Sequence, residues 1–467
     1  MEIVLVLLFW GGAIYGLLRD TKILIYLYFL GMPFGTFAVV PVELTKGLTI
    51  LPSVAAAALL IVKVLGSSRG VQYVVRAAGS VDRLGLLFGF LFVAGIVTAF
   101  SPILFSGKVD VIPMRFEPGG GEEPLVPTLQ NLSQFLYLTL SAFSLLAFSR
   151  ILKHDYWISL SFRAIYVAAV VVVITGWVEY FNSIFGFEEL LSPLRNASYA
   201  INNVAEALGE RRLAGLMPEA SSYGSLSLAF LSFLLFCKST FVQLGFGKAG
   251  LHILQGFLVI SVWMSTSSSA YVGFAFLVML ILLQRAHVYM FKPRAGVAVS
   301  GYKDLFIFYG LLLLGVAYVV LQPSILDPML AMIDKMVLNK AESSSYEERT
   351  YWTIVSWNAL LDTFGVGVGL GGTRASNSLV MVFSNTGFVG GVLFYGMLVN
   401  FYLRKAFPED AVGKNLLMSL KWAFLPPLFT SVLAGTSADI GLFPAFQLGL
   451  MAALPDRRGV CWSGKRG

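Results

Sequence analysis

Two arginines, a carboxylate and several hydroxyl groups gather in residues 211–224, RRLAGLMPEASSYG, directly before a long apolar run. A guanidinium such as that of Arg211 or Arg212 stays protonated and offers a planar set of N–H donors that matches phosphate oxygens. Glu219, shortly after them, is placed to orient an arginine or to accept a proton from a hydroxyl. This combination suits a charged, polar substrate. The competing interpretation is a solvated loop with an exposed ion pair, which contributes little stability.

Two more arginines occur in the second half of the chain, within EERTYWTIVSW and GVGVGLGGTRASN. On a helix, Arg349, Trp352 and Ser356 share one face, so the aromatic ring would hold this arginine and aim it inward. A solvated, charged turn is the alternative, because two glutamates precede Arg349. Arg374 follows a glycine run whose backbone amides are able to cradle an anion. Turn formation and packing explain such glycines equally well, and no strand precedes them as a dinucleotide-binding motif requires.

A further hydroxyl-rich segment, STSSSAYVG at 265–273, lies between two apolar runs, where capping of the next helix is its alternative role. The histidines His154, His252 and His287 are scattered, and no cluster has the spacing of metal ligands. We therefore expect no metal, no cofactor and no serine–histidine catalytic pair.

Membrane helices must position these segments, because 57% of the residues are hydrophobic and only 13% are charged. About 17–25 apolar residues are needed to cross a bilayer as a helix. The sequence predicts an all-α polytopic membrane protein, residues 1–467 forming a single integral membrane domain with about 12–13 transmembrane helices. The predicted spans are roughly 3–18, 22–40, 48–65, 84–105, 132–149, 163–182, 223–241, 249–265, 270–286, 304–322, 379–403, 415–434 and 438–454.

The distribution of lysine and arginine predicts the orientation. Alternate loops hold most of these residues, and such loops face the cytoplasm. This places the N-terminus outside and the C-terminus in the cytoplasm, with Cys237 and Cys461 on the reducing side, where no structural disulfide is expected. The net charge of +7 expresses the same bias, so it does not indicate nucleic acid as a partner. The first ten residues lack the basic start of a cleaved signal peptide.

Three external segments are long. Residues 106–131 include EPGGGEEPLVP, which is typical of a flexible acidic connector. Residues 183–222 have apolar residues at helical spacing and predict an interfacial helix that ends near Gly209. Residues 323–378 predict amphipathic helices at roughly 327–339 and 346–362, with Trp352 and Trp357 at the membrane interface. The apolar positions of the predicted interfacial helix are Ile201, Val204, Ala205 and Leu208.

The spans themselves contain few charges. Glu179 and Lys421 are the main exceptions, and we expect both to snorkel to an interface. A transporter would instead place ionisable groups along a path near the bilayer midplane and would show an internal repeat. Neither feature is evident, so the chemistry is expected on the outer face.

In order and in topology, these segments resemble the superfamily of O-antigen ligases and O-antigen or exopolysaccharide polymerases of bacterial inner membranes. Three departures from the pattern stand out: Ala220 in place of proline, Ser268 in place of arginine, and Ser376 in place of the histidine of ligases. The matching residues are Arg212, Gly215, Glu219 and Ser221, then Ser265, Ser267, Ser269 and Ala270, then Arg349, Trp352, Gly365, Gly367, Gly369, Asn377, Gly387 and Gly390.

The resemblance implies polymerisation of undecaprenyl-diphosphate-linked repeats on the periplasmic side of the inner membrane, without a metal. Ligation of a finished glycan to a lipid or protein acceptor remains the alternative within the family, and a lipid-linked glycan transporter is the alternative from another class. A chain-length regulator and a flippase are the protein partners that a polymerase would have. The catalytic candidates are Arg212, Glu219 and Arg349, and the substrate-binding candidates are Arg211, Arg374, Trp352, Ser268, Ser376 and Asn377.

Overall fold

The computed structural model describes residues 2–41, 44–45, 49–80, 84–114, 121–185, 191–197, 206–207, 210–291, 344–407 and 410–456. Helices make up most of this part of the chain, and the strands form two short antiparallel hairpins, β1–β2 and β3–β4. The helices are α1 (Glu2–Leu18), α2 (Thr21–Leu30), α3 (Pro52–Leu65), α4 (Ser68–Ala78), α5 (Leu86–Leu104), α6 (Leu129–Ile151), α7 (Asp155–Phe185), α8 (Ala220–Phe236), α9 (Lys238–Gln243), α10 (Lys248–Met264), α11 (Ser268–Phe291), α14 (Ser344–Asp362), α15 (Ser378–Leu403), α16 (Ala411–Ala434) and α17 (Leu442–Ala453). The strands are β1 (Asp110–Val111), β2 (Glu123–Pro124), β3 (Glu206–Ala207) and β4 (Glu210–Arg211).

Six described helices are long and apolar enough to cross a membrane: α5, α6, α7, α11, α15 and α16. A seventh crossing is available if α3 and α4, which are bent by 96°, are counted together. Five further apolar helices are shorter: α1, α2, α8, α10 and α17. The chain is therefore an all-α, multi-pass membrane protein. Twelve of the thirteen predicted spans overlap described helices, although only six of those helices are long enough to cross alone, whereas the tenth span, 304–322, and the amphipathic helix at 327–339 lie outside the described residues.

Two predicted spans are shorter than expected. The second, 22–40, is helical only through Leu30, because glycine and proline follow in GMPFG and end the helix. The last begins at Leu442, after Gly441 with a φ of 79°. The predicted interfacial helix in 183–222 is wrong where it is described, since Glu206–Ala207 pairs with Glu210–Arg211 as a hairpin. The rest of that segment's apolar pattern lies outside the described residues.

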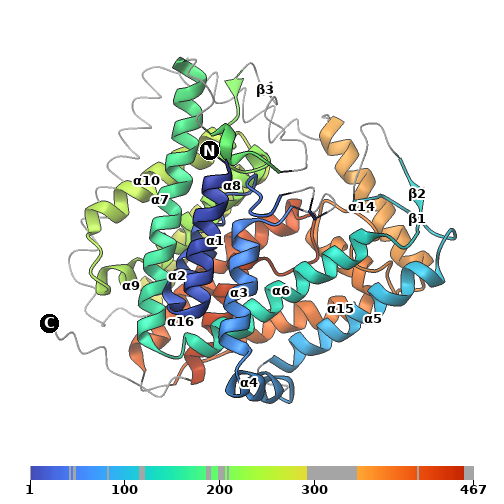
Figure 1. The fold of residues 1–467 in the computed structure, drawn as a ribbon, viewed down its shortest axis with the longest axis horizontal. Coiled ribbons are helices and arrows are strands. Elements are labelled where there is room, and N and C mark those ends of the chain that lie inside the picture. The colour runs from blue at the N-terminus through green and yellow to red at the C-terminus, as the bar shows by residue number, and fades with distance from the viewer. Residues whose placement is uncertain are drawn as a thin grey trace.

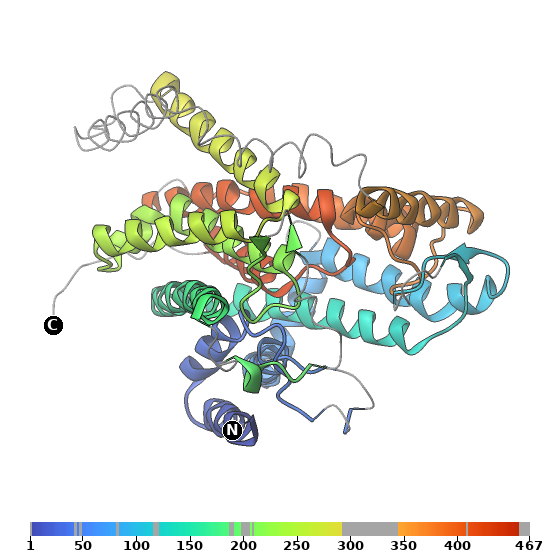
Figure 2. The same ribbon diagram turned by 90° about the horizontal axis from the view of Figure 1, so that it is seen from above.

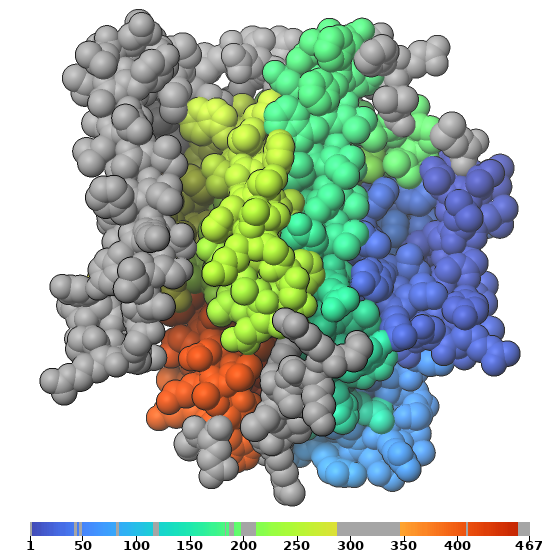
Figure 3. All heavy atoms as spheres, turned by 90° about the vertical axis from the view of Figure 1, so that its left-hand side faces the viewer, coloured from blue at the N-terminus to red at the C-terminus, as the bar shows by residue number. Residues whose placement is uncertain are grey.

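The helices surround one large apolar core. In Figure 1, α7 runs along the vertical beside α1 and α2, while α5, α6 and α15 slope away to the right. Figure 2 looks nearly along α7 and shows α5 and α6 side by side. Figure 3 shows α7 packed beside α10 on one face. Where α2, α6 and α17 meet, the ring of Phe446 lies 4.9 Å from that of Phe29 and 5.2 Å from that of Phe148, between ring centroids. This contact fixes the last helix against the first half of the chain.

The alternation of helix direction brings the polar segments to one end of the molecule. The starts of α8, α11 and α15 and the ends of α10 and α16 carry those segments. The opposite ends carry basic residues that flank helices, among them Lys238, Lys248, Arg404 and Lys405. The fold therefore separates a polar, hydroxyl-rich end from a basic end.

Candidate functional site

A cavity of about 500 Å³ lies at the polar end of the molecule. Its walls come from the starts of α8 and α11, from α14, from the loop before α15 and from the end of α16. All three predicted segments thus meet at one site, and the end of α16 joins them. The lining residues are Glu219, Ser221, Ser222, Ser225, Ser269, Glu348, Arg349, Trp352, Arg374, Ser376, Pro427, Thr430, Ser431, Ala434, Gly435 and Thr436.

Arg212 belongs to the segment before α8, and its side chain lies beside this cavity, against the turn between α10 and α11. Its Nε donates a hydrogen bond of 3.0 Å to the hydroxyl of Thr266. Thr266 has a φ of 44°, a conformation that non-glycine residues rarely adopt and that often occurs at functional sites. Burial lowers the pKa of Arg212, the charge of Glu219 raises it, and the charge of Arg349 lowers it. Arg212, Glu219 and Arg349 therefore lie close enough to interact electrostatically.

Glu219 is the N-cap residue of α8, with extended backbone and an exposed side chain. The hydroxyl of Ser221 donates a hydrogen bond to its carboxylate. The same carboxylate interacts favourably with the charges of both Arg212 and Arg374. Glu219 thus lines the cavity near both arginines, and its role there as a positioning group or proton acceptor stays a prediction.

The backbone after Arg212 is held by Glu179 of α7. One carboxylate oxygen of Glu179 accepts N–H bonds from Ala214, at 2.7 Å, and from Gly215, at 2.6 Å. Its other oxygen lies 2.7 Å from Nη2 of Arg195, which also donates to the carbonyl of Gly215 at 2.9 Å. Glu179 is therefore held by partners within the protein, and its place near a membrane interface stays a prediction. A lone carboxylate in an apolar helix was the signal, because such a group requires a partner.

Trp352 of α14 holds an arginine, but a different one from that predicted. The guanidinium carbon of Arg374 lies 4.2 Å from the centroid of the Trp352 ring, within the range of a cation–π interaction. Trp352 is only 6% exposed, so its predicted place at the membrane interface is also wrong, whereas Trp357 is 37% exposed. Arg349 lines the cavity one turn before Trp352.

The segment that carries Arg374 is fixed through its backbone. The hydroxyl of Ser356 bonds to the hydroxyl of Thr373 at 2.9 Å and donates to the carbonyl of Arg374 at 3.1 Å. The N–H of Arg374 donates to the carbonyl of Ile112 at 2.9 Å. Burial lowers the pKa of Arg374, the charge of Glu219 raises it, and that of Arg349 lowers it. A rigid backbone thus presents a partly desolvated guanidinium to the cavity.

Three arginines therefore converge without direct neutralisation. None of Arg212, Arg349 and Arg374 has a carboxylate within ion-pair distance among the residues that the structure describes. Glu219 and Glu348 contribute longer-range attraction only. Like charges held together at a partly buried site repel one another. Such an arrangement is suited to an anion with several oxygen atoms.

The glycine run packs the loop and does not cradle an anion. Gly367 has a φ of 87°, and a Cβ atom there would lie 2.5 Å from the backbone nitrogen of Gly387, at the break in α15. The amide of Val368 donates to the carbonyl of Ser384 at 2.8 Å, and that of Leu370 donates to the hydroxyl of Thr98 at 3.1 Å. None of the glycines from 365 to 372 lines the cavity. Packing is therefore the interpretation that holds.

Of the remaining predicted substrate-binding residues, one lines the cavity and the others do not or lie outside the described side chains. Ser376 lines the cavity, is 5% exposed, and its hydroxyl has no hydrogen-bond partner in the described part of the chain. Asn377 instead caps α15, since its side chain accepts from the amides of Leu379 and Val380. At the start of α11 the cavity is lined by Ser269, and Ser268 lies outside that lining. Arg211 lies in β4, and its side chain is outside the described part.

The acidic connector at 106–131 has more structure than predicted. Asp110 pairs with Pro124 in the β1–β2 hairpin, and Glu122 accepts a bond of 2.7 Å from the hydroxyl of Tyr351. Ile112 is buried against Trp352 of α14. This segment therefore supports α14 from outside the cavity, and the prediction of a flexible connector is wrong for its described part.

Among the described residues, no three His, Cys, Asp or Glu side chains form a group able to hold a metal ion. Comparisons of the sequence with protein-family models and with curated proteins find no significant match.

Proposed function

We propose that this protein transfers glycan from a polyprenyl-diphosphate-linked donor to a sugar hydroxyl, and that it polymerises lipid-linked repeats into O-antigen or exopolysaccharide. The proposal places the cavity on the outer face of the bacterial inner membrane, the side opposite the basic helix ends. The observation that carries it is that Arg349 and Arg374, without ion pairs in the described part, line a hydroxyl-rich cavity with Arg212 beside it.

The arginines would bind the diphosphate of the donor. In the reaction the bond between the anomeric carbon and the diphosphate oxygen breaks, and a bond to the acceptor oxygen forms. Negative charge develops on the departing diphosphate, and positioned cations stabilise that charge. Glu219 would either accept the proton from the acceptor hydroxyl or hold an arginine in position.

The hydroxyl-bearing wall suits a sugar. Ser221, Ser222, Ser225, Ser269 and Thr430 offer groups that both donate and accept hydrogen bonds, as sugar hydroxyls do. The position of Ser376 favours polymerase over ligase, because the family resemblance leads us to expect a histidine there in ligases. Transfer of a finished glycan to another acceptor remains the second candidate, and it differs only in the acceptor.

The test uses the purified full-length protein, reconstituted with an undecaprenyl-diphosphate-linked repeat. Arg212→Ala and Arg349→Ala should each lower polymer formation roughly 100- to 1,000-fold, as loss of one charge-stabilising group does in other enzymes. Arg285→Ala is the control, since Arg285 is exposed and lies at the far end of α11. Normal long-chain product from both cavity variants would overturn the proposal. Transfer to a different acceptor without chain growth would favour the ligase.

A further inference from the structure

The short helix α4 leaves the fold in an unusual direction. It follows α3 after a break at Gly66 and Ser67 and is bent from it by 96°. The hydroxyl of Ser67 caps its first turn by accepting from the amide of Gly70 at 3.2 Å. In Figure 1, α4 lies across the foot of α3, at the end of the molecule away from the cavity. In Figure 1, α3 runs nearly parallel to α7, one of the six helices long enough to cross a membrane, so α4 runs nearly perpendicular to that crossing direction.

One side of α4 is fixed to the protein. The hydroxyl of Tyr73 bonds to that of Ser149, near the end of α6, at 2.7 Å. The ammonium of Lys153 lies 5.3 Å from the centroid of the Tyr73 ring. Gly70 and Ala77 are buried on this side. The orientation of α4 about its own axis is therefore set by packing.

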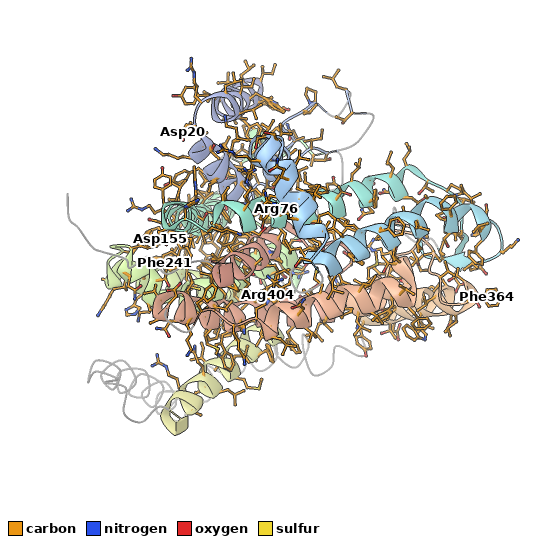
Figure 4. The ribbon with its side chains drawn as sticks, turned by 90° about the horizontal axis from the view of Figure 1, so that it is seen from below. Asp20, Arg76, Asp155, Phe241, Phe364 and Arg404 are labelled. Atoms are coloured by element: carbon orange, nitrogen blue, oxygen red, sulfur yellow. The ribbon has the colours of Figure 1, made fainter. Side chains whose placement is uncertain are left out.

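The two remaining flanks of α4 differ in chemistry. At about 100° per residue, Val71 and Val75 fall on one flank, and Arg69 and Arg76 fall on the other, roughly 130° away. Val71 is 54% exposed and Val75 is 66% exposed. The helix contains no carboxylate, and the guanidinium of Arg76 donates only to the neutral side-chain amide of Gln72, at 3.4 Å, so the helix does not neutralise its own arginines. Figure 4 looks at this end of the molecule, with Arg76 and Arg404 labelled.

We propose that α4 lies in the bilayer surface and binds anionic lipid headgroups. Val71 and Val75 enter the acyl region, and Arg69 and Arg76, together with Lys153, contact lipid phosphates. An apolar flank beside a basic flank is the arrangement by which helices seat at the interface of anionic membranes. Free phosphate would account for the arginines alone, whereas a lipid surface accounts for both flanks. This inference is independent of the proposed catalytic function.

The seating depth can be measured by spin labelling of the full-length protein in vesicles of phosphatidylcholine and phosphatidylglycerol. We expect a nitroxide at Val75→Cys to be relaxed mainly by oxygen, which concentrates among the acyl chains. A nitroxide at Arg69→Cys, on the arginine flank, should be relaxed mainly by a water-soluble nickel complex. Equal accessibility at the two positions would overturn the proposal.

Headgroup binding can be measured as the rise in unfolding temperature when phosphatidylglycerol replaces phosphatidylcholine. In the double variant Arg69→Gln, Arg76→Gln this rise should fall by more than half. Lys108→Gln is the matched control, because Lys108 is exposed beyond the far end of α5. An undiminished rise in the double variant, or an equal loss in the control, would overturn the assignment.

Discussion

Two groups of charged side chains have opposite surroundings: Glu179 and Arg195 form the first, and Arg349 and Arg374 form the second. Arg195 is paired with Glu179 at 2.7 Å, and both also bind the backbone at Gly215. Arg349 and Arg374 face the cavity with no ion pair in the described part of the chain. The first group is ion-paired within the protein and holds the backbone at Ala214 and Gly215 in place. The second has no ion pair in the described part of the chain, an arrangement that suits an anion with several oxygen atoms.

The largest difference between the two groups should appear in stability. Glu179→Ala removes the ion pair with Arg195 and the acceptor of two amides, so we expect a loss of about 3–5 kcal/mol in the free energy of unfolding. Arg349→Ala removes a repelling charge and should change this free energy by less than about 0.5 kcal/mol. Unfolding in detergent measures both. Equal losses would remove the distinction between the two groups.

The second largest effect should be the stabilisation of the protein by an added anion, which should depend on the cavity arginines. Inorganic pyrophosphate at about 100 times its Kd should stabilise the wild-type protein by roughly 2.7 kcal/mol. The effect should vanish in Arg349→Ala, and chloride at equal ionic strength serves as the control. Pyrophosphate that stabilises Arg349→Ala as well as the wild type would show that the cavity arginines do not form the anion site.

The stacking of Arg374 on Trp352 should have a smaller effect. A desolvated cation–π contact is worth about 1–2 kcal/mol. Trp352→Leu should therefore weaken pyrophosphate binding by roughly five- to thirtyfold, measured by the same thermal shift. Trp352→Phe keeps an aromatic face and should retain part of the affinity. If leucine and phenylalanine had equal effects, the ring would serve only as packing.

The smallest effect is expected at Ser376. Its buried hydroxyl has no partner in the described part of the chain, so Ser376→Ala should leave the free energy of unfolding unchanged or raise it by up to about 1 kcal/mol. Polymer formation should fall modestly if this hydroxyl meets the substrate. Asn377→Ala is the contrast, because it removes the cap of α15 and should cost about 1 kcal/mol of stability. A larger stability loss at Ser376 than at Asn377 would reverse these roles.

Sequence reasoning located the cavity segments but misassigned several contacts within them. Periodicity placed α14 correctly, and the pattern of arginine near tryptophan suggested a held guanidinium. The guanidinium that reaches Trp352 belongs to Arg374, which is distant in sequence and arrives through a loop. Sequence reasoning also missed the role of Glu179. Its partners are the backbone amide of Ala214, which follows β4, and the guanidinium of Arg195. Pairings between separate segments leave no periodic signal in one chain.

The glycine loop illustrates the same limit. Glycines spaced by two residues are compatible both with an anion cradle and with a tightly packed turn. Only the approach of Gly367 to Gly387, together with amides already bonded to Ser384 and Thr98, decides for packing. The spacing of glycines indicates which backbone conformations the loop is able to adopt. It does not indicate which segment of the protein, or which ligand, packs against the loop.

By itself the sequence determined that this chain is a bundle of apolar helices, because long runs without charge have few stable alternatives. It also determined which polar segments lie at one end, because helices that alternate in direction return to the same side at every second turn. The tertiary structure alone decided which charges are neutralised. Whether an arginine supports the backbone, as Arg195 does, or faces a cavity, as Arg349 does, depends on partners far away in the chain. Electrostatic energies depend on distance and burial, and folding sets both.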